Sequence, residues 1–304
     1  MQALSDTIIA TTGPIPDPLI FQLLTTIMTH TRSYQVHLQA LVALAHVADR
    51  QNCAVILLSG GLYRIAAVMA AYPDVPVIQN AALSVCGALM KTEPDTGYGS
   101  IAQAAFNTLA SLPVQGDVPL YCSALDALSN IATISMKLRD SVTFLPELFK
   151  CIASCMDTHT ALVEIQRSVC RLLVSIASSP PAQAVRSTPP AQAALSTSAW
   201  LHRLKRAMAC YRDSFELQDH ACTVLLALSP LSDALAKIVL PDVIAAVQAH
   251  PQGRVQSVGY GFLVKYKHLS AAFFECEGGA EVYDITVSFA ASRLLRFLLT
   301  LPAL

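Results

Sequence analysis

Small and aliphatic residues recur along this chain at the spacing of one helix face. In LYCSALDALSNIATISMKLRD, residues 120–140, Ala124, Leu128 and Ile131 are separated by four and then three positions. Because an α-helix has about 3.6 residues per turn, these side chains lie one above another on the same side. The pattern therefore predicts a helix with one buried face.

The same triplet occurs in five further segments. They are Ala40, Leu44 and Val47; Ala81, Val85 and Ala88; Val169, Leu173 and Ile176; Ala221, Leu225 and Leu228; and, as a weaker copy, Gly259, Leu263 and Tyr266. The first residues of successive copies lie 41, 43, 45, 52 and 38 positions apart. A helix that recurs at such a period is typical of stacked helical repeats, in which each copy buries its apolar faces against its neighbours.

The intervals between the copies carry a second recurring pattern. Residues 52–74 contain a short apolar run that ends at Gly60-Gly61 and a second apolar run that ends at Pro73-Asp74. Gly can end a helix because it adopts positive φ without a steric penalty. Other segments that fit the second run are IFQLLTTIM, IAQAAFNTLASL, FLPELFKCIASCM, WLHRLKRAMACY and LPDVIAAVQA, and Gly278-Gly279 repeats the Gly pair. The predicted unit is short helix, turn, helix, turn, long helix.

The longest interval contains an insertion. Residues 178–198 repeat PPAQA and are rich in Pro, Ser and Ala, so we expect a surface loop there. Ser187, Thr188 and Ser196 are candidates for a regulatory modification, and an insertion without a role is the simpler alternative. The expected organisation is an N-terminal extension at 1–14 followed by one solenoid domain at 15–304 with this loop inserted.

The predicted three-helix unit resembles the armadillo repeat. The residues that carry the resemblance are ALDALSNIA at 124–132, LQALVALAHVA at 38–48 and AVILLSGGLYRIAAVM at 54–69. In that family the long third helix has this small-then-aliphatic face, and Gly follows the first helix. The resemblance implies an all-α, right-handed α-solenoid of about six to seven repeats whose concave groove binds proteins. HEAT repeats share the period but lack the Gly-ended first helix, and they are the fold alternative.

The resemblance also indicates where partners would bind. Armadillo proteins of the nuclear-import class hold an extended peptide with a ladder of Asn residues on their third helices. Asn130 stands at that position here, and the other copies have His46, Gly87, Ser175, Ala227 and Lys265. The ladder is broken, and the Trp that accompanies it in the family is absent, so an import adaptor is not implied. The groove candidates are His46, Asp126, Asn130, Arg171 and Lys265.

The charge and the cysteine content indicate which class of partner and which cellular compartment to expect. Only 13% of residues are charged and the net charge is −1, so the chain lacks the basic field that nucleic-acid binding requires. The nine cysteines are an odd number, and most lie within apolar helical patterns, which is typical of a reducing compartment. We expect a cytoplasmic protein, with the nucleus as the alternative, whose partners are other proteins.

Two helical segments hold further candidate chemistry. Segment 201–212 carries a basic side that suits either an acidic partner or solvent, formed by Arg203, Lys205, Arg206 and Arg212. Segment 151–159 carries three residues of zinc-ligand type at intervals of four, namely Cys151, Cys155 and His159. One straight helix seldom supplies three zinc ligands, so we expect these residues to pack in the core.

The remaining patterns favour a non-catalytic protein. No phosphate-binding Gly-rich loop, H-E-x-x-H or G-x-S-x-G motif occurs, so we expect no enzyme, cofactor or metal. The expected function is a scaffold or adaptor for protein partners. The alternative is a membrane-associated subunit, because residues 285–304 are strongly apolar. Arg293 and Arg296 near the middle of that segment would each cost about 2.5–3.5 kcal/mol at a bilayer centre, which favours a packed terminal helix.

Overall fold

The computed structural model describes most of the repeat region and divides the chain into two compact units. The described residues are 15–29, 33–48, 52–89, 98–112, 117–134, 140, 142, 143, 145, 147–177, 194–251, 253–266, 268 and 269. Unit 1 is Met1–Gln183 and unit 2 is Ala184–Leu304. The N-terminal extension, most of the predicted loop at 178–198 and the apolar segment 285–304 lie outside the described residues, so the predictions for them remain predictions.

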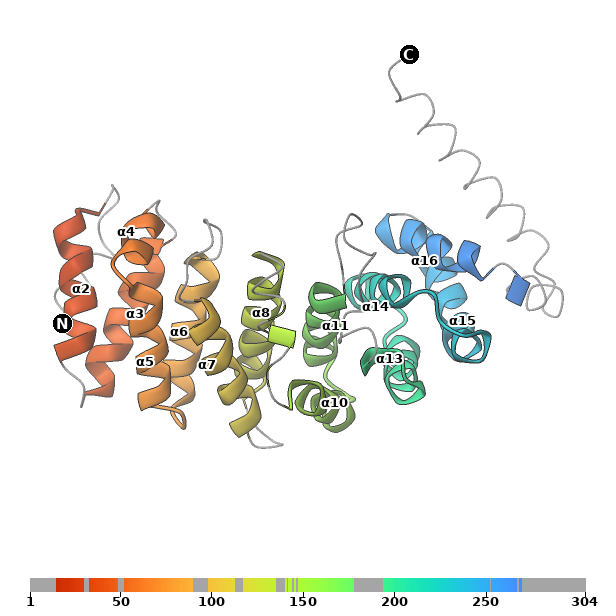
Figure 1. Ribbon diagram of the computed structural model, residues 1–304, viewed down its shortest axis with the longest axis horizontal. Coiled ribbons are helices and arrows are strands. Elements are labelled where there is room, and N and C mark those ends of the chain that lie inside the picture. The colour runs from red at the N-terminus through yellow and green to blue at the C-terminus, as the bar shows by residue number, and fades with distance from the viewer. Residues whose placement is uncertain are drawn as a thin grey trace, which may run out of the picture. The chain divides into compact units, whose positions relative to one another are not determined.

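Unit 1 consists of helices arranged in two layers (Figure 1). The helices are α2 (Asp17–Thr29), α3 (Tyr34–Ala48), α4 (Cys53–Leu58), α5 (Gly61–Ala71), α6 (Pro76–Leu89), α7 (Tyr98–Ser111), α8 (Val118–Ile134), α10 (Leu148–Thr158) and α11 (Val163–Ala177). Helices α3, α6, α8 and α11 contact one another in succession and form the third-helix layer. Helices α2, α5, α7 and α10 do the same and form the second-helix layer.

Unit 2 repeats this two-layer arrangement over a shorter stretch. Its helices are α13 (Ser198–Cys210), α14 (Phe215–Leu228), α15 (Asp233–Ala249) and α16 (Arg254–Lys265). Helix α13 packs on α15, and α14 packs on α16, so each layer contains two helices of the described residues. The described part of both units is helical without a β-strand, which confirms the predicted all-α solenoid.

The predicted triplets line the core between the layers. Five of the six copies are buried as predicted, for example Ala124, Leu128 and Ile131, each 0% exposed. The second copy is shifted by one position from the prediction, because Ala82, Cys86 and Leu89 are each 0% exposed. Of the predicted residues only Val85 is fully buried, whereas Ala81 and Ala88 are half-buried. The groove position assigned to Gly87 consequently belongs to Ala88. The pair Ala81-Ala82 offers two equally small residues, so the sequence alone did not fix this register.

The Gly pair ends the short first helix as predicted. Helix α4 stops before Gly60, which has a φ of 70°, and α5 starts at Gly61. A Cβ at Gly61 would lie 2.5 Å from the Ile56 side chain, so the corner closes only around a residue without one. In unit 2 the segment LPDVIAAVQA, assigned to a second helix, is the C-terminal part of a longer helix, because α15 runs unbroken through Pro241 over 17 residues.

A buried polar residue recurs near the start of five third helices, namely α3, α6, α8, α11 and α14. Gln79, Gln166 and Gln218 each donate two hydrogen bonds from Nε2 to carbonyl oxygens at the end of the preceding second helix, over distances of 2.7–3.0 Å. His37 Nε2 lies 2.9 Å from Ile27 O, and Tyr121 Oη donates to Leu112 O over 3.2 Å. The last carbonyls of a helix have no partner within it, and these clamp residues provide one. The clamp residues are His37, Gln79, Tyr121, Gln166 and Gln218.

Candidate protein-interaction site

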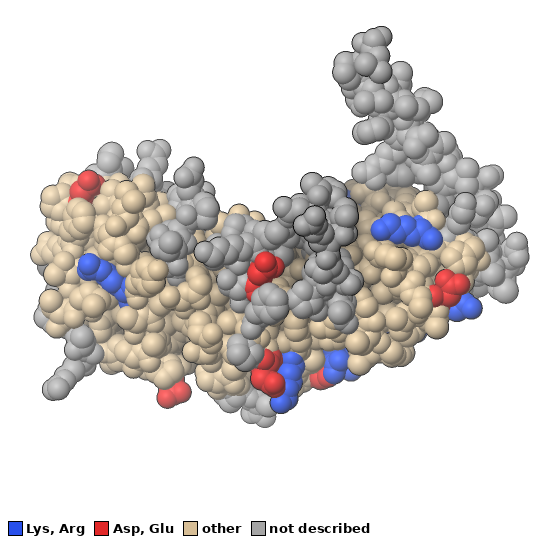
Figure 2. Space-filling model, viewed as in Figure 1, with Lys and Arg blue, Asp and Glu red and all other residues tan. Residues whose placement is uncertain are grey.

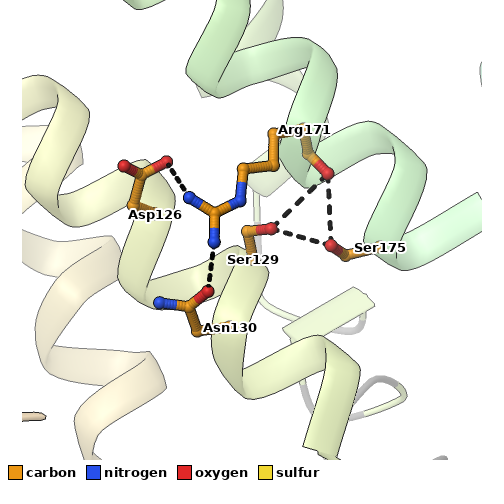
Figure 3. A network of polar contacts seen from close by, with 5 residues as sticks. All are labelled: Asp126, Ser129, Asn130, Arg171 and Ser175. Carbon is orange, nitrogen blue, oxygen red and sulfur yellow. Dashed lines mark hydrogen bonds and ion pairs between the residues drawn. The ribbon is translucent and has the colours of Figure 1, made fainter. Parts of the chain in front are cut away.

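Three of the predicted groove residues meet in one cluster in unit 1. Asp126 and Asn130 lie one turn apart on α8, and the Arg171 side chain extends from α11 between them (Figure 3). Arg171 Nη2 donates to Asn130 Oδ1 over 2.6 Å, and Nη1 lies 3.4 Å from Asp126 Oδ1. We call Asp126, Asn130 and Arg171 the central polar cluster.

The repeat register explains why these residues meet. Asp126 and Arg171 each follow the first triplet residue of their copy by two positions. Because α8 and α11 are neighbouring third helices of the stack, equivalent positions lie side by side. A residue one turn further along α8, Asn130, is then within reach of the long Arg side chain.

A second set of polar contacts holds the two helices together beneath the cluster. Ser129 Oγ and Ser175 Oγ are 2.7 Å apart, and both lie within hydrogen-bonding distance of Arg171 O, at 3.5 and 3.1 Å (Figure 3). Both serine residues are buried, at 1% and 6% exposure. Hydrogen bonds between buried groups are costly to break, so they fix the backbone from which Arg171 projects.

The central polar cluster is accessible to solvent, and its Arg171–Asp126 ion pair contributes little to stability. The side chains of Arg171 and Asp126 are 43% and 37% exposed, and an ion pair with that exposure contributes at most about 1 kcal/mol. The guanidinium group therefore remains available for exchange with an acceptor on a partner. Figure 2 shows that charged side chains are few and scattered over the face drawn.

The other two groove candidates do not join this cluster. His46 lies half-buried on α3, and its Nε2 atom is buried without a hydrogen-bond partner among the described residues. Lys265 is exposed at the end of α16, in unit 2. Ser175, at the equivalent position on α11, is buried against Ser129 and so belongs to the packing between helices.

A contact that the sequence analysis missed extends the polar surface by one repeat. Ser123 Oγ on α8 donates to Asn80 Oδ1 on α6 over 2.8 Å. The triplet pattern selects buried positions and gives no weight to Asn80. Asn80 directly follows the clamp residue Gln79. An alignment of the copies that included the one-residue shift of the second copy would have drawn attention to this position.

The basic helix is partly neutralised within unit 2. On α13, Arg203 stacks over Trp200, with its guanidinium carbon 5.4 Å from the ring centroid. Burial raises the pKa of the Asp242 carboxyl on α15, and the positive charges of Lys205 and Arg212 oppose that shift. This basic side therefore has an acidic group nearby and an aromatic ring beneath it, which leaves less charge for an acidic partner.

The segment that contains Cys151, Cys155 and His159 packs against the neighbouring helix α8. Cys155 and His159 are buried at 5% and 7% exposure, and the His159 ring meets Tyr121 edge-on with centroids 4.8 Å apart. Burial lowers the pKa of the His159 imidazole. Within the described residues, no three His, Cys, Asp or Glu side chains are grouped so that they could hold a metal ion.

None of the described helices combines the length and the apolar character that crossing a membrane requires. The segment that motivated the membrane alternative, 285–304, lies outside the described residues.

Comparison with solved structures defines the fold class. No family model matches the sequence, and no curated protein matches it. Two engineered proteins solved by the Northeast Structural Genomics Consortium superpose with TM-scores of 0.60 and 0.62 at 18% and 17% identity. These matches cover 80% and 84% of this chain and 96% and 98% of theirs.

A designed armadillo repeat protein is similar to the same degree. It superposes with a TM-score of 0.61 at 15% identity, over 80% of this chain and 97% of that one. The chain is thus a helical repeat protein, and its repeats have the armadillo-like fold that the third-helix pattern and the Gly-ended first helix predicted. At these identities the likeness concerns the fold.

Proposed function

We propose that the chain is a non-catalytic scaffold or adaptor that binds a protein partner on the third-helix layer of unit 1. The observation that carries this proposal is the central polar cluster, because it presents half-exposed hydrogen-bonding groups from two adjacent helices on a backbone fixed by buried contacts. Polar groups held in this way are typical of the binding face of a helical repeat protein.

The chemistry of the cluster favours an extended segment that offers acceptors. A guanidinium group presents several N–H donors in one plane, and it binds carbonyl or carboxylate oxygens well. The Asn130 amide adds both a donor and an acceptor. A partner segment that offers a polar or acidic residue to the guanidinium group therefore fits this face.

The test compares wild-type protein with two variants as bait in extracts of the source cells. The first variant is Asp126→Ala, Asn130→Ala, Arg171→Ala. The matched control is Gln103→Ala, Asn107→Ala, which removes an exposed polar pair from α7 in the second-helix layer, where the two side chains hydrogen-bond over 2.8 Å. Circular dichroism and thermal unfolding establish that all three proteins are folded.

The expected result is a partner that the wild type and the α7 control retain and the triple variant loses. Binding of the purified partner should weaken by at least about tenfold, because an arginine at the centre of an interface contributes on the order of 2 kcal/mol. Equal recovery by the folded triple variant and the wild type would show that the third-helix layer around Arg171 is not the binding surface.

A further inference from the structure

A small cavity lies between α7 and α10 in the second-helix layer of unit 1, on the opposite layer from the central polar cluster. Its volume is about 280 Å³, just below the range of about 300–1,000 Å³ for small-molecule pockets. Helices α7 and α10 pack against each other less extensively than α5 and α7, the preceding pair of the same layer. The cavity therefore reaches Tyr121 of α8, which belongs to the third-helix layer.

Three aromatic rings from three parts of the chain line this cavity. Phe106 comes from α7, Tyr121 from α8, and His159 directly follows the last residue of α10. All three residues are buried, and Leu109 and Leu112 add aliphatic surface beside them. Aromatic rings associate in offset-stacked and edge-to-face arrangements, so these walls suit a further ring.

Two of the three rings are held in place by contacts within the protein. Tyr121 Oη donates a hydrogen bond to Leu112 O over 3.2 Å, and the Tyr121 and His159 rings meet edge-on with centroids 4.8 Å apart. Gln166 Nε2 donates to His159 O over 3.0 Å, which fixes the backbone that carries the imidazole. Because these walls are already ordered, binding a ligand costs little conformational entropy.

The two charged residues that line the cavity are paired with each other. Lys150 Nζ lies 2.9 Å from Glu147 Oε2, and both side chains are exposed, so the pair lies at the mouth. Burial, together with the nearby thiols, raises the pKa of the Tyr121 phenol to about 12, and burial lowers the pKa of the His159 imidazole. Both rings are thus uncharged at neutral pH. An ionised ligand would find its counter-charge already engaged, so the cavity favours an uncharged one.

Helix α10 supplies hydroxyl groups at the edge of the cavity. Ser154 and Thr158 lie one helical turn apart, are exposed, and belong to the lining. A hydroxyl group both donates and accepts hydrogen bonds. A ligand with one polar, uncharged group can therefore place its ring among the aromatic walls and its polar group against α10.

From this arrangement we propose that the α7–α10 cavity binds a small, uncharged aromatic compound of one or two rings that carries a hydroxyl or a similar hydrogen-bonding group. An aromatic side chain of a protein offers the same ring but brings its peptide backbone with it. The main-chain groups within α7 and α10 are paired along each helix, so such a backbone would find few partners there. The free compound is therefore the assigned ligand, and the inference does not depend on partner binding at the third-helix layer.

The test measures the binding of 2-naphthol to the full-length chain at pH 7 by isothermal titration calorimetry. We expect one saturable site with a Kd below about 1 mM, which is in the range for a ligand with so few heavy atoms. The probe 2-naphthoate has the same two rings with a carboxylate and should bind at least about tenfold more weakly. Lack of saturable 2-naphthol binding, or equal affinity for the two probes, would overturn the proposal.

Two matched variants locate the site. Ala110→Phe replaces an exposed α7 residue that lines the cavity, and it should weaken 2-naphthol binding at least about tenfold because the new ring occupies the space. Ala70→Phe makes the same change at an exposed position of α5 outside the lining and should leave the Kd within about twofold. Equal affinity of the two folded variants would contradict the assignment.

Hydrogen-exchange mass spectrometry of the wild-type chain locates the site without any variant. Saturating 2-naphthol should slow amide exchange in α7 and α10 and leave α13–α16 unchanged. Slower exchange that spares α7 and α10 would refute the proposal, whether or not Ala110→Phe folds.

Two further comparisons test the class of ligand. Glu147→Gln frees Lys150, so it should strengthen 2-naphthoate binding several-fold and leave 2-naphthol binding nearly unchanged. An unaltered preference between the two probes would refute the role assigned to the ion pair. The capped amino acid N-acetyl-3-(2-naphthyl)alaninamide carries the same rings on a peptide backbone and should bind no more tightly than 2-naphthol. If it binds about tenfold more tightly, the cavity takes a protein side chain and the assignment to a free compound is wrong.

Discussion

Gln79 is the clamp residue with the most described hydrogen bonds. Its Nε2 donates to Met69 O and Tyr72 O, and its Oε1 accepts a hydrogen bond from Thr108 Oγ1 over 2.7 Å. One buried side chain, 1% exposed, thereby joins the end of α5, the start of α6 and the neighbouring helix α7. A single residue can thus determine how two repeats are held together.

We predict that Gln79→Ala lowers the free energy of unfolding by about 2–3 kcal/mol, because the carbonyls at the end of α5 and the Thr108 hydroxyl lose buried partners. Urea denaturation followed by circular dichroism measures the change. Gln103→Ala on the exposed side of α7 is the control, with an expected change within about 0.5 kcal/mol. A Gln79→Ala effect as small as that of the control would contradict the assigned role of the clamp.

The buried carboxyl of Asp242 leads to a prediction about how the free energy of unfolding depends on pH. Burial raises the pKa of its carboxyl, so the folded chain holds this proton more tightly than the unfolded chain does. The contribution of the group to stability is therefore complete at acidic pH and is lost as the pH rises through the carboxyl range. Asp242→Asn removes this ionisation, and we expect its free energy of unfolding to exceed that of the wild type at pH 7.

The difference between Asp242→Asn and the wild type should shrink as the pH approaches about 3.5, where the native carboxyl is protonated as well. Denaturation in urea at several pH values measures it. Asp233→Asn changes an exposed carboxyl at the start of the same helix and should bring no gain at pH 7. Lower stability of Asp242→Asn at neutral pH would show that Lys205 and Arg212 outweigh burial.

At the scale of helices, two glycines on third helices are expected to respond in opposite ways to the same substitution. A Cβ at Gly259 of α16 would collide with Val247 Cγ2 of α15, whereas a Cβ at Gly87 of α6 would meet no atom within 4 Å. Gly259→Ala should lower the free energy of unfolding by about 1–3 kcal/mol through overpacking. Gly87→Ala should raise it by about 0.5–1 kcal/mol, since Ala favours the helix.

Denaturation curves of the two glycine variants provide the measurement, and each variant serves as the control for the other. If both substitutions stabilise the protein, the packing of α15 on α16 is looser than the structure indicates. If both destabilise it, the helix-propensity argument fails at Gly87.

The helices could be predicted from the sequence where buried side chains recur at helical spacing within one segment. The triplets located every third helix, because a buried face leaves a regular trace in the chain. Asp126 and Arg171 could be paired for the same reason, since equivalent positions of stacked copies become neighbours. The clamp residues were missed because each is one polar residue beside an apolar run, and its partner carbonyls leave no trace in the sequence. The spacing of Cys151, Cys155 and His159 was visible in the sequence, but the contact of the His159 ring with Tyr121 required the placement of α8.

At the scale of the whole chain, a local loss of stability is expected to affect some repeats more than others. Each repeat contacts its neighbours along the stack, so a local loss of stability should spread to adjacent repeats first. We predict that Gln79→Ala increases amide hydrogen exchange most in α5, α6 and α7 and least in α13–α16. Hydrogen-exchange mass spectrometry on the full chain tests this, with Gln218→Ala as the reciprocal variant that should act on α13–α16.

A uniform increase in exchange over both units after Gln79→Ala would mean that the chain unfolds as one cooperative body. An increase confined to the repeats around α6 would mean that the units open independently. The two outcomes assign different numbers of cooperative segments to the same fold.

The clamps also bear on how this chain can change in length. The clamps Gln79, Gln166 and Gln218 all donate to the carbonyl oxygens of the residues ten and seven positions earlier in the chain. The interval between clamp residues, by contrast, grows from 42 positions between Gln79 and Tyr121 to 52 between Gln166 and Gln218. Insertions and deletions are therefore tolerated between one third helix and the next second helix, and excluded from the corner that a clamp closes. Lineages that lengthen this protein should do so where the Pro-rich segment now stands.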